Sequence, residues 1–374
     1  MESLIYTGLL ILLWIANLFN GTGLDSVYHV TEWTRKVVIL LFFINLLLDY
    51  ARTHTLLQDK KKLYIYGGMI IVFIASPFIQ GYGFTGIDYL WVFCLVYLLS
   101  KFKINDRTMF WIGLIYGALG FSVLLIFDYG TLLKGWNTNS IAMIGMHSFL
   151  VMIVPFFKKQ QIRNKIFMLI AAGIFSVLVS QTDSRSGIFF AFIGALFAIG
   201  LLPRGIVTKN YFRTFICLIL PLIIAVVVIA VSNSSNMEEL NIWSYQQFGK
   251  PMFNGRDELW KYGFELLWQN PLIGTGNLNA NNWHNSAVTC LVASGIMGFA
   301  FWIMTFGKIL DRARSYLNDY IVVGCFVSFI VLYVQQSVEL GFISGSPSLL
   351  GYILLGLMLG RVRFLEESED YGAN

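Results

Sequence analysis

Long apolar stretches recur along the whole chain, and they constrain its fold more than any other feature. Runs of about 17 or more mostly apolar residues are long enough to cross a hydrocarbon core about 30 Å thick. Hydrophobic residues make up 57% of the sequence and charged residues only 13%, whereas soluble domains carry about 25% charged residues. Because an open sheet cannot satisfy its backbone hydrogen bonds in lipid, we predict an all-α, polytopic membrane helix bundle.

Hydropathy predicts about twelve membrane spans. The first has no basic region before it, since only Glu2 is charged there, and no small-residue cleavage site follows it. We therefore expect this span to be retained as a helix and not removed as a signal peptide. The predicted spans are 3–20, 37–50, 63–80, 87–100, 108–127, 139–157, 166–181, 187–202, 212–231, 286–307, 320–338 and 346–360.

The basic residues indicate how these spans are oriented. When alternate loops are assigned to opposite sides, 19 of the 26 Lys and Arg residues fall on one side. The positive-inside rule makes that side cytoplasmic, together with both termini, so the net charge of +5 reflects topology and not nucleic-acid binding. The chain then divides into nine spans over 1–231, a large exported loop over 232–284, and three spans with a cytoplasmic tail over 285–374.

Two arginines on the exported side are not explained by topology, and the first is Arg185. It lies in a short turn between two spans, where an ionised side chain is costly unless it is paired or hydrated. Arg185 either pairs with Asp183 or reaches the lipid head groups. Alternatively, it forms an anion site, because a guanidinium binds phosphate oxygens in a forked geometry and the hydroxyls of Ser184 and Ser186 add donors.

The second is Arg256, in a helix that we predict within the exported loop. Asn254 is a suitable N-cap and Asn270-Pro271 a suitable end. Arg256 then lies in the first turn, where free backbone N–H groups also favour an anion. An apolar stripe on this helix, which would lie on the membrane surface or cap the bundle, consists of Trp260, Phe264, Leu267 and Trp268.

Two further features of the loop are glycine and tryptophan residues. The segment Gly274-Thr275-Gly276 either forms a backbone nest for an anion or is a tight turn. Tryptophans often belong to the aromatic belt at a membrane interface, and their faces also permit stacking with sugar rings. The loop contains Trp243, Trp260, Trp268 and Trp283.

His284 ends the exported loop at the mouth of the next span. An imidazole there can titrate near neutral pH and act as a general base. No second histidine or cysteine stands at ligand spacing, so we expect no zinc and no other metal. His147 lies inside an apolar span and is expected to be a satisfied core residue or to make a helix–helix hydrogen bond.

These motifs, in this order, resemble the O-antigen ligase and polysaccharide polymerase superfamily of bacterial envelope enzymes. Residues 138–142 also resemble the Asn-x-x-Ala element of that family. The other matching elements are Ser-Arg-Ser-Gly from Ser184, Gly-Arg from Gly255 with Trp260 four residues after the arginine, Asn-Pro-Leu-Ile-Gly-Thr-Gly from Asn270, and His284-Asn285.

The resemblance implies a metal-independent glycosyltransferase in the bacterial cytoplasmic membrane, with an outward-facing active site, no cofactor, and a glycan on undecaprenyl diphosphate as donor. Arg185 and Arg256 would bind the diphosphate, and His284 would activate the acceptor hydroxyl. A glycan or envelope acceptor and a chain-length regulator are the other implied partners. The residues expected to contact substrate are Ser184, Ser186, Trp260, Gly274, Gly276 and Asn285.

Three functions remain open. A polymerase would join lipid-linked repeat units into capsule, exopolysaccharide or O-antigen. A ligase would transfer the glycan once, to lipid A-core or another envelope acceptor. A transporter or flippase is the third alternative, although the sequence suggests no proton relay and no pair of broken helices.

Overall fold

The computed structural model describes residues 2–20, 29–53, 60–128, 138–158, 161–182, 184–234, 237–277, 282–339, 341–343 and 348–372. These residues form helices joined by turns and contain no strand, so the predicted all-α fold is confirmed. The helices are α1 (Glu2–Asn20), α3 (Val30–Thr53), α4 (Lys60–Ile79), α5 (Ile87–Leu99), α6 (Asp106–Asp128), α7 (Thr138–Met152), η1 (Val154–Phe157), α8 (Ile162–Ser180), α9 (Arg185–Ala198), α10 (Gly205–Thr208), α11 (Tyr211–Ser232), α12 (Met237–Phe248), α13 (Arg256–Gln269), α14 (Ser286–Ala313), η2 (Arg314–Tyr316), α15 (Tyr320–Gln335) and α16 (Leu349–Gly372).

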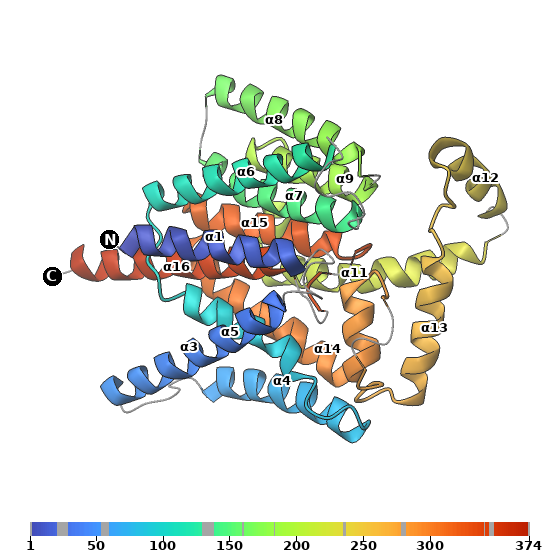
Figure 1. The fold of residues 1–374 in the computed structure, drawn as a ribbon, viewed down its shortest axis with the longest axis horizontal. Helices are drawn as coiled ribbons and strands as arrows, with labels where there is room; N and C mark the ends of the chain where they lie inside the picture. The colour runs from blue at the N-terminus through green and yellow to red at the C-terminus, as the bar shows by residue number, and fades with distance from the viewer. Residues whose placement is uncertain are drawn as a thin grey trace.

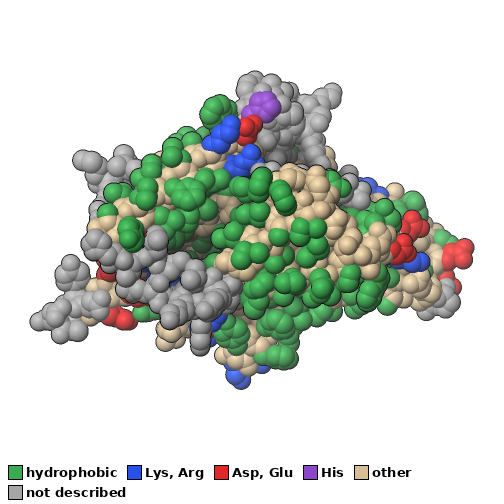
Figure 2. Space-filling model, turned by 90° about the horizontal axis from the view of Figure 1, so that it is seen from below, with side chains coloured by type: hydrophobic (Ala, Val, Ile, Leu, Met, Phe, Trp, Pro, Cys, Tyr) green, Lys and Arg blue, Asp and Glu red, His purple; other side chains and the backbone are tan. Residues whose placement is uncertain are grey.

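Each of the twelve predicted spans overlaps a helix. Within the described ranges, α6, α8, α11 and α14 are long and apolar enough to cross a membrane, and several shorter helices are also apolar. Many large hydrophobic side chains, such as Leu47, Ile71 and Phe167, are exposed. The face shown in Figure 2 is largely hydrophobic, with few charged side chains. Such an apolar surface is typical of a protein that faces lipid.

Helices α15 and α16 form the centre of the bundle (Figure 1). Residues 321–333 and 349–362 are all buried, and they pack against each other and against neighbours that include α5, α7 and α9. The start of α1 and the end of α16 lie at one end of the molecule, and α12 and α13 lie at the other (Figure 1). The side of the membrane on which each end lies remains a prediction.

Helix α14 is broken at Gly295, where we expected a continuous span. Gly295 has φ 68° and ψ −173°, a conformation open essentially to glycine alone. The carbonyls of Val292 and Ala293, which lose their helical partners, accept instead from the N–H groups of Thr275 and Gly276, each at 2.8 Å. Loop 271–276 therefore fills the break.

The same loop also satisfies the backbone N–H groups that follow the break in α14. The N–H groups of Ile296 and Met297 donate to the carbonyls of Pro271 and Leu272, at 2.9 and 3.2 Å. Ser76 of α4 adds hydrogen bonds to the carbonyls of Ile273 and Ala293. Because irregular backbone in a membrane protein must be satisfied by other protein groups, this insertion explains how a broken helix persists here.

The loop that we predict to be exported forms two helices of different character. α13 packs against α11 and α14, and its Trp260 belongs to a small core with Ala225, Trp283 and Val288. α12 extends away from the bundle (Figure 1). It is tied to the connection before α13, since the amide N–H of Met252 donates to Asn241 Oδ1 (3.0 Å) and Ser244 Oγ donates to the carbonyl of Lys250 (2.8 Å).

Candidate active site

Arg185 is the first residue of α9, and the turn before it is held by local hydrogen bonds. Ser184 is the N-cap, and its hydroxyl accepts from the N–H of Gly187 at 3.4 Å. Thr182 is buried and donates to the carbonyl of Val179. Arg185 is therefore placed at a helix N-terminus, two residues earlier than the predicted start of this span at 187. Asp183, its suggested ion-pair partner, lies outside the described residues.

Arg256 is likewise the first residue of its helix, α13. The predicted N-cap, Asn254, is wrong by one residue, because Gly255 takes that position in the left-handed region with φ 76°. No side chain caps α13, and Asn254 itself has φ 55°. These two consecutive left-handed residues turn the chain sharply into the helix. The end at Asn270 was predicted correctly.

The starts of α9 and α13 meet at a cleft of about 70 Å³. Three cations, Arg185, Arg256 and Lys250, face one carboxylate there, that of Glu339. This excess of positive charge suits an anion with more than one negative charge. Asn139 brings α7 to the cleft, and it belongs to the segment 138–142 that resembles a family element. The lining residues are Asn139, Ser184, Arg185, Ser186, Lys250, Asn254, Arg256 and Glu339.

Arg256 is largely buried but has few protein partners. Its Nη2 lies 3.8 Å from Glu339 Oε1, too far for a hydrogen bond. Its Nε is buried without a hydrogen-bond partner among the described residues. Burial lowers the pKa of Arg256, Glu339 opposes this effect, and nearby Arg185 adds to it. The guanidinium therefore retains donors that an anion in the cleft could satisfy.

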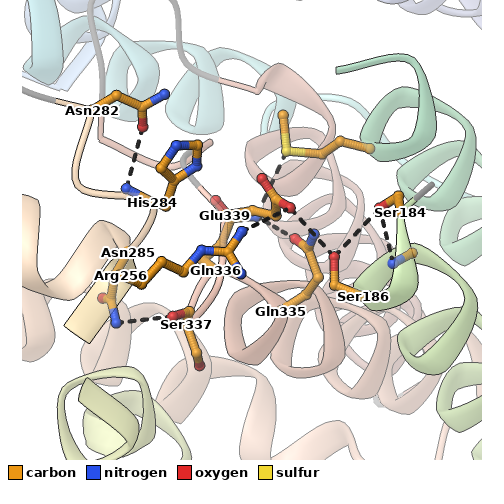
Figure 3. A network of polar contacts seen from close by, with 12 residues as sticks. Ser184, Ser186, Arg256, Asn282, His284, Asn285, Gln335, Gln336, Ser337 and Glu339 are labelled. Carbon is orange, nitrogen blue, oxygen red and sulfur yellow. Dashed lines mark hydrogen bonds and ion pairs between the residues drawn. The ribbon is translucent and has the colours of Figure 1, made fainter. Parts of the chain in front are cut away.

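Glu339 follows α15 and links the two helix starts. Its Oε1 lies 3.5 Å from the hydroxyl of Ser186 on α9, and the same oxygen faces Arg256 of α13 (Figure 3). Burial raises the pKa of Glu339 to about 7, even though Arg256 and the Ser186 hydroxyl act to lower it. This carboxyl group can therefore change its charge near neutral pH.

His284 lies beside these groups but does not line the cleft itself. Its backbone has φ 47°, which is unusual for a residue other than glycine, and its N–H donates to Asn282 Oδ1 at 3.2 Å. Figure 3 shows its ring close to Glu339 and Arg256. Burial and then the charge of Arg256 lower the pKa of His284 from its ordinary 6.5, so the imidazole is neutral and able to accept a proton at pH 7.

Asn285 fixes the position of His284 and has no donor or acceptor left for a substrate. It is fully buried and caps α14, where its Oδ1 accepts from the N–H groups of Ala287 and Val288. Its Nδ2 donates to the carbonyls of Pro221 and Ser337, at 2.8 and 3.1 Å. The prediction that Asn285 contacts substrate is therefore wrong, since its amide holds three segments together.

Trp260 was also predicted to contact substrate, and its burial contradicts this. Its side chain is 1% exposed, and its indole Nε1 donates to the carbonyl of Trp283 at 2.6 Å. Trp283 is equally buried. Trp268, which we placed in the same apolar stripe, is 77% exposed. Of the four loop tryptophans, only Trp243 and Trp268 present faces that a lipid or a glycan could cover.

The predicted anion nest at Gly274 and Gly276 is wrong as well. The N–H groups of Gly274, Thr275 and Gly276 all donate to backbone carbonyls within the protein. A Cβ on Gly274 would lie 2.5 Å from the carbonyl oxygen of Val292, and one on Gly276 would lie 2.8 Å from that of Ser76. These glycines therefore allow the loop to enter the break in α14 and do not serve a ligand.

Lys250 and Glu339 are the site residues that sequence reasoning did not assign. Lys250 is one of seven basic residues on the side that we predict to be exported, and this asymmetry was the signal that could have identified it. Glu339 had no signal beyond its place after an apolar span. His147 is buried, and its Nδ1 lies 2.7 Å from the hydroxyl of Ser348, the residue that precedes α16.

Comparison with known families supports the resemblance noted from the motifs. Residues 168–303 match a family model described as O-Antigen ligase. The matched segment runs from α8 into α14 and contains Arg185, Arg256 and His284, so the prediction of the O-antigen ligase and polymerase superfamily is confirmed. The match indicates a membrane glycosyltransferase of this type. No curated protein matches the chain.

Proposed function

We propose that this protein is a metal-independent glycosyltransferase that polymerises undecaprenyl-diphosphate-linked repeat units into a surface polysaccharide. The observation that carries the proposal is the buried, under-paired guanidinium of Arg256 beside Arg185 at the starts of two helices. Two helix N-termini and two arginines together favour a diphosphate, because their charges and N–H donors all point to an anion.

In the proposed reaction an acceptor hydroxyl attacks the anomeric carbon of the donor glycan. The bond from that carbon to the diphosphate oxygen breaks, and the electron pair leaves with the diphosphate. Arg185 and Arg256 stabilise the growing negative charge, an electrostatic effect that does not depend on a metal. Neutral His284 accepts the hydroxyl proton and thereby prevents an oxonium from forming.

Lys250 and Glu339 also have roles in the proposed binding of the diphosphate. Lys250, at the connection from α12 to α13, adds a third positive charge at the cleft. Glu339 competes with the incoming diphosphate for Arg256. Because the pKa of Glu339 is raised to about 7, the carboxyl group can take up a proton when the diphosphate binds, which removes the repulsion between them.

Incubation of the purified protein with lipid-linked repeat units, followed by gel analysis of the lipid-linked glycan, tests the proposal. A polymerase gives a ladder with wild type and little or none with His284→Ala. A single shifted band that requires a separate acceptor indicates a ligase instead. If the wild type transfers nothing but moves intact substrate across vesicle membranes, the glycosyltransferase proposal is wrong.

A further inference from the structure

A second cavity, separate from the active-site cleft, lies between α11 and the end of α14. Its volume is about 140 Å³. The active-site cleft is near the start of α14, whereas this groove is near its end, beyond the break at Gly295. The groove is lined by Tyr211, Thr214, Phe215, Leu218, Ile303, Met304, Gly307, Lys308 and Arg314.

The walls of the groove are apolar and open to the surface. Phe215 and Met304 are 45% and 40% exposed. Gly307 leaves space between the helices, because a Cβ there would find only the hydroxyl of Tyr211, at 4.0 Å. Such a space can take an aliphatic chain, whose apolar surface would be removed from water between the two helices.

The mouth of the groove is positively charged. Among the described residues, Lys308 has no hydrogen-bond or ion-pair partner. Arg314 donates to the carbonyl of Thr208 (2.9 Å) and to Thr214 Oγ1 (3.0 Å), and its Nε is buried without a hydrogen-bond partner. Asp311 lies 3.6 Å from that Nε, so this carboxylate pairs with Arg314 and leaves the charge of Lys308 unbalanced.

We infer that this groove binds an anionic phospholipid, with an acyl chain between α11 and α14 and the phosphate at Lys308 and Arg314. Apolar walls beneath a cationic mouth match both parts of such a lipid, whereas a zwitterionic lipid would bring its own ammonium group to the cations. A basic residue near a membrane surface contributes about 1 kcal/mol to binding an anionic lipid. The inference does not depend on the proposed glycosyltransferase activity.

The experiment measures lipid retention by native mass spectrometry of the purified protein exchanged into mixed phosphatidylglycerol and phosphatidylcholine. Wild type should retain phosphatidylglycerol preferentially. Lys308→Gln should lower this preference about fivefold, the factor that corresponds to the loss of one such cation. Lys209→Gln is the matched control, because Lys209 is exposed at the same end of α11 but does not line the groove.

A second pair of variants tests the cavity without a change in charge. Gly307→Leu should fill the groove and abolish the preference, whereas Gly307→Ala, which meets only the distant Tyr211 hydroxyl, should keep it. The inference is overturned if wild type shows no preference for phosphatidylglycerol, if Lys308→Gln and Lys209→Gln behave alike, or if added undecaprenyl phosphate displaces the phospholipid from wild type. Circular dichroism verifies that the variants compared are folded.

Discussion

Arg256 Nη2 and Glu339 Oε1 lie 3.8 Å apart in a cleft where both side chains are mostly buried. At this distance the pair attracts electrostatically but shares no hydrogen bond. Glu339 therefore keeps Arg256 charged and in place while leaving its donors for another anion. A closer pair would have occupied the guanidinium, and without the carboxylate nothing in the pair would offset the repulsion between Arg256 and nearby Arg185.

The first prediction concerns Arg256. Arg256→Ala should lower the transfer rate about 10²–10³-fold, the effect typical of removing one preorganised donor from a developing negative charge. Arg256→Lys should restore only part of this rate, because an ammonium cannot fork onto two phosphate oxygens. The rates would be measured with purified protein and lipid-linked repeat units. Lys261→Ala, an exposed site on the same helix, should behave as wild type, and equal rates for Arg256→Ala and Lys261→Ala would contradict the assignment.

The second prediction is a pH profile for His284. Because the pKa of His284 is lowered from 6.5 by burial and by Arg256, the neutral base persists at pH 7, and the transfer rate should fall only as the pH drops below 6.5. His284→Ala should lose about 10²–10⁴-fold in rate. Arg256→Gln removes a charge that lowers the pKa of His284. In this variant, whose residual activity is measured the same way, the fall in transfer rate at acid pH should therefore begin at a higher pH. If this fall in rate occurs at the same pH in the variant and in wild type, Arg256 and His284 do not interact.

The third prediction links Glu339 to stability. Its folded-state pKa is about 7 against an ordinary 4.5, so between these values the folded protein holds a proton that the unfolded chain has released. Stability contributed by this proton is lost as the pH rises through that window. Glu339→Gln should therefore be more stable than wild type at pH 8, on the order of a few kcal/mol, and equal to it near pH 4. Thermal unfolding across pH tests this, and a difference that is constant with pH would refute it.

The fourth prediction concerns the break in α14. Gly295→Ala places a Cβ 2.3 Å from the carbonyl of Leu272, so it should destabilise the protein by about 1–3 kcal/mol beyond the cost of the positive φ. Gly200→Ala is the matched control, because Gly200 has φ 79° and no atom near its Cβ position. It carries only the backbone strain, of about 1–2 kcal/mol. Equal losses in thermal stability for the two variants would show that loop 271–276 does not press against the break.

The sequence was sufficient to predict the helices, because apolar runs of membrane length have few other structures open to them. It also predicted that Arg256 lies in the first turn of a helix and that Arg185 and Arg256 belong together, since neither is explained by topology. These predictions rest on local patterns, in which composition and position along the chain carry the information.

The remaining features depend on contacts between distant segments. Gly274 and Gly276 have the same local pattern in an anion nest and in a loop that enters a helix break, and only the neighbouring carbonyls of α14 distinguish the two. Trp260 could equally have been exposed or buried until its partner Trp283 was known. Glu339 acquires its raised pKa from burial between two helix starts, which no pattern around residue 339 reveals.

The break in α14 also imposes an order on the assembly of the protein. Val292, Ala293, Ile296 and Met297 have backbone groups whose partners lie in loop 271–276, and Ser76 of α4 completes the arrangement. In the lipid interior no water is available to hydrogen-bond these groups before loop 271–276 is in place. The first half of α14 therefore reaches its final hydrogen bonding only after the preceding loop has folded back beside α4. Folding of the helix that begins next to His284 is in this way coupled to α4, a helix much earlier in the chain.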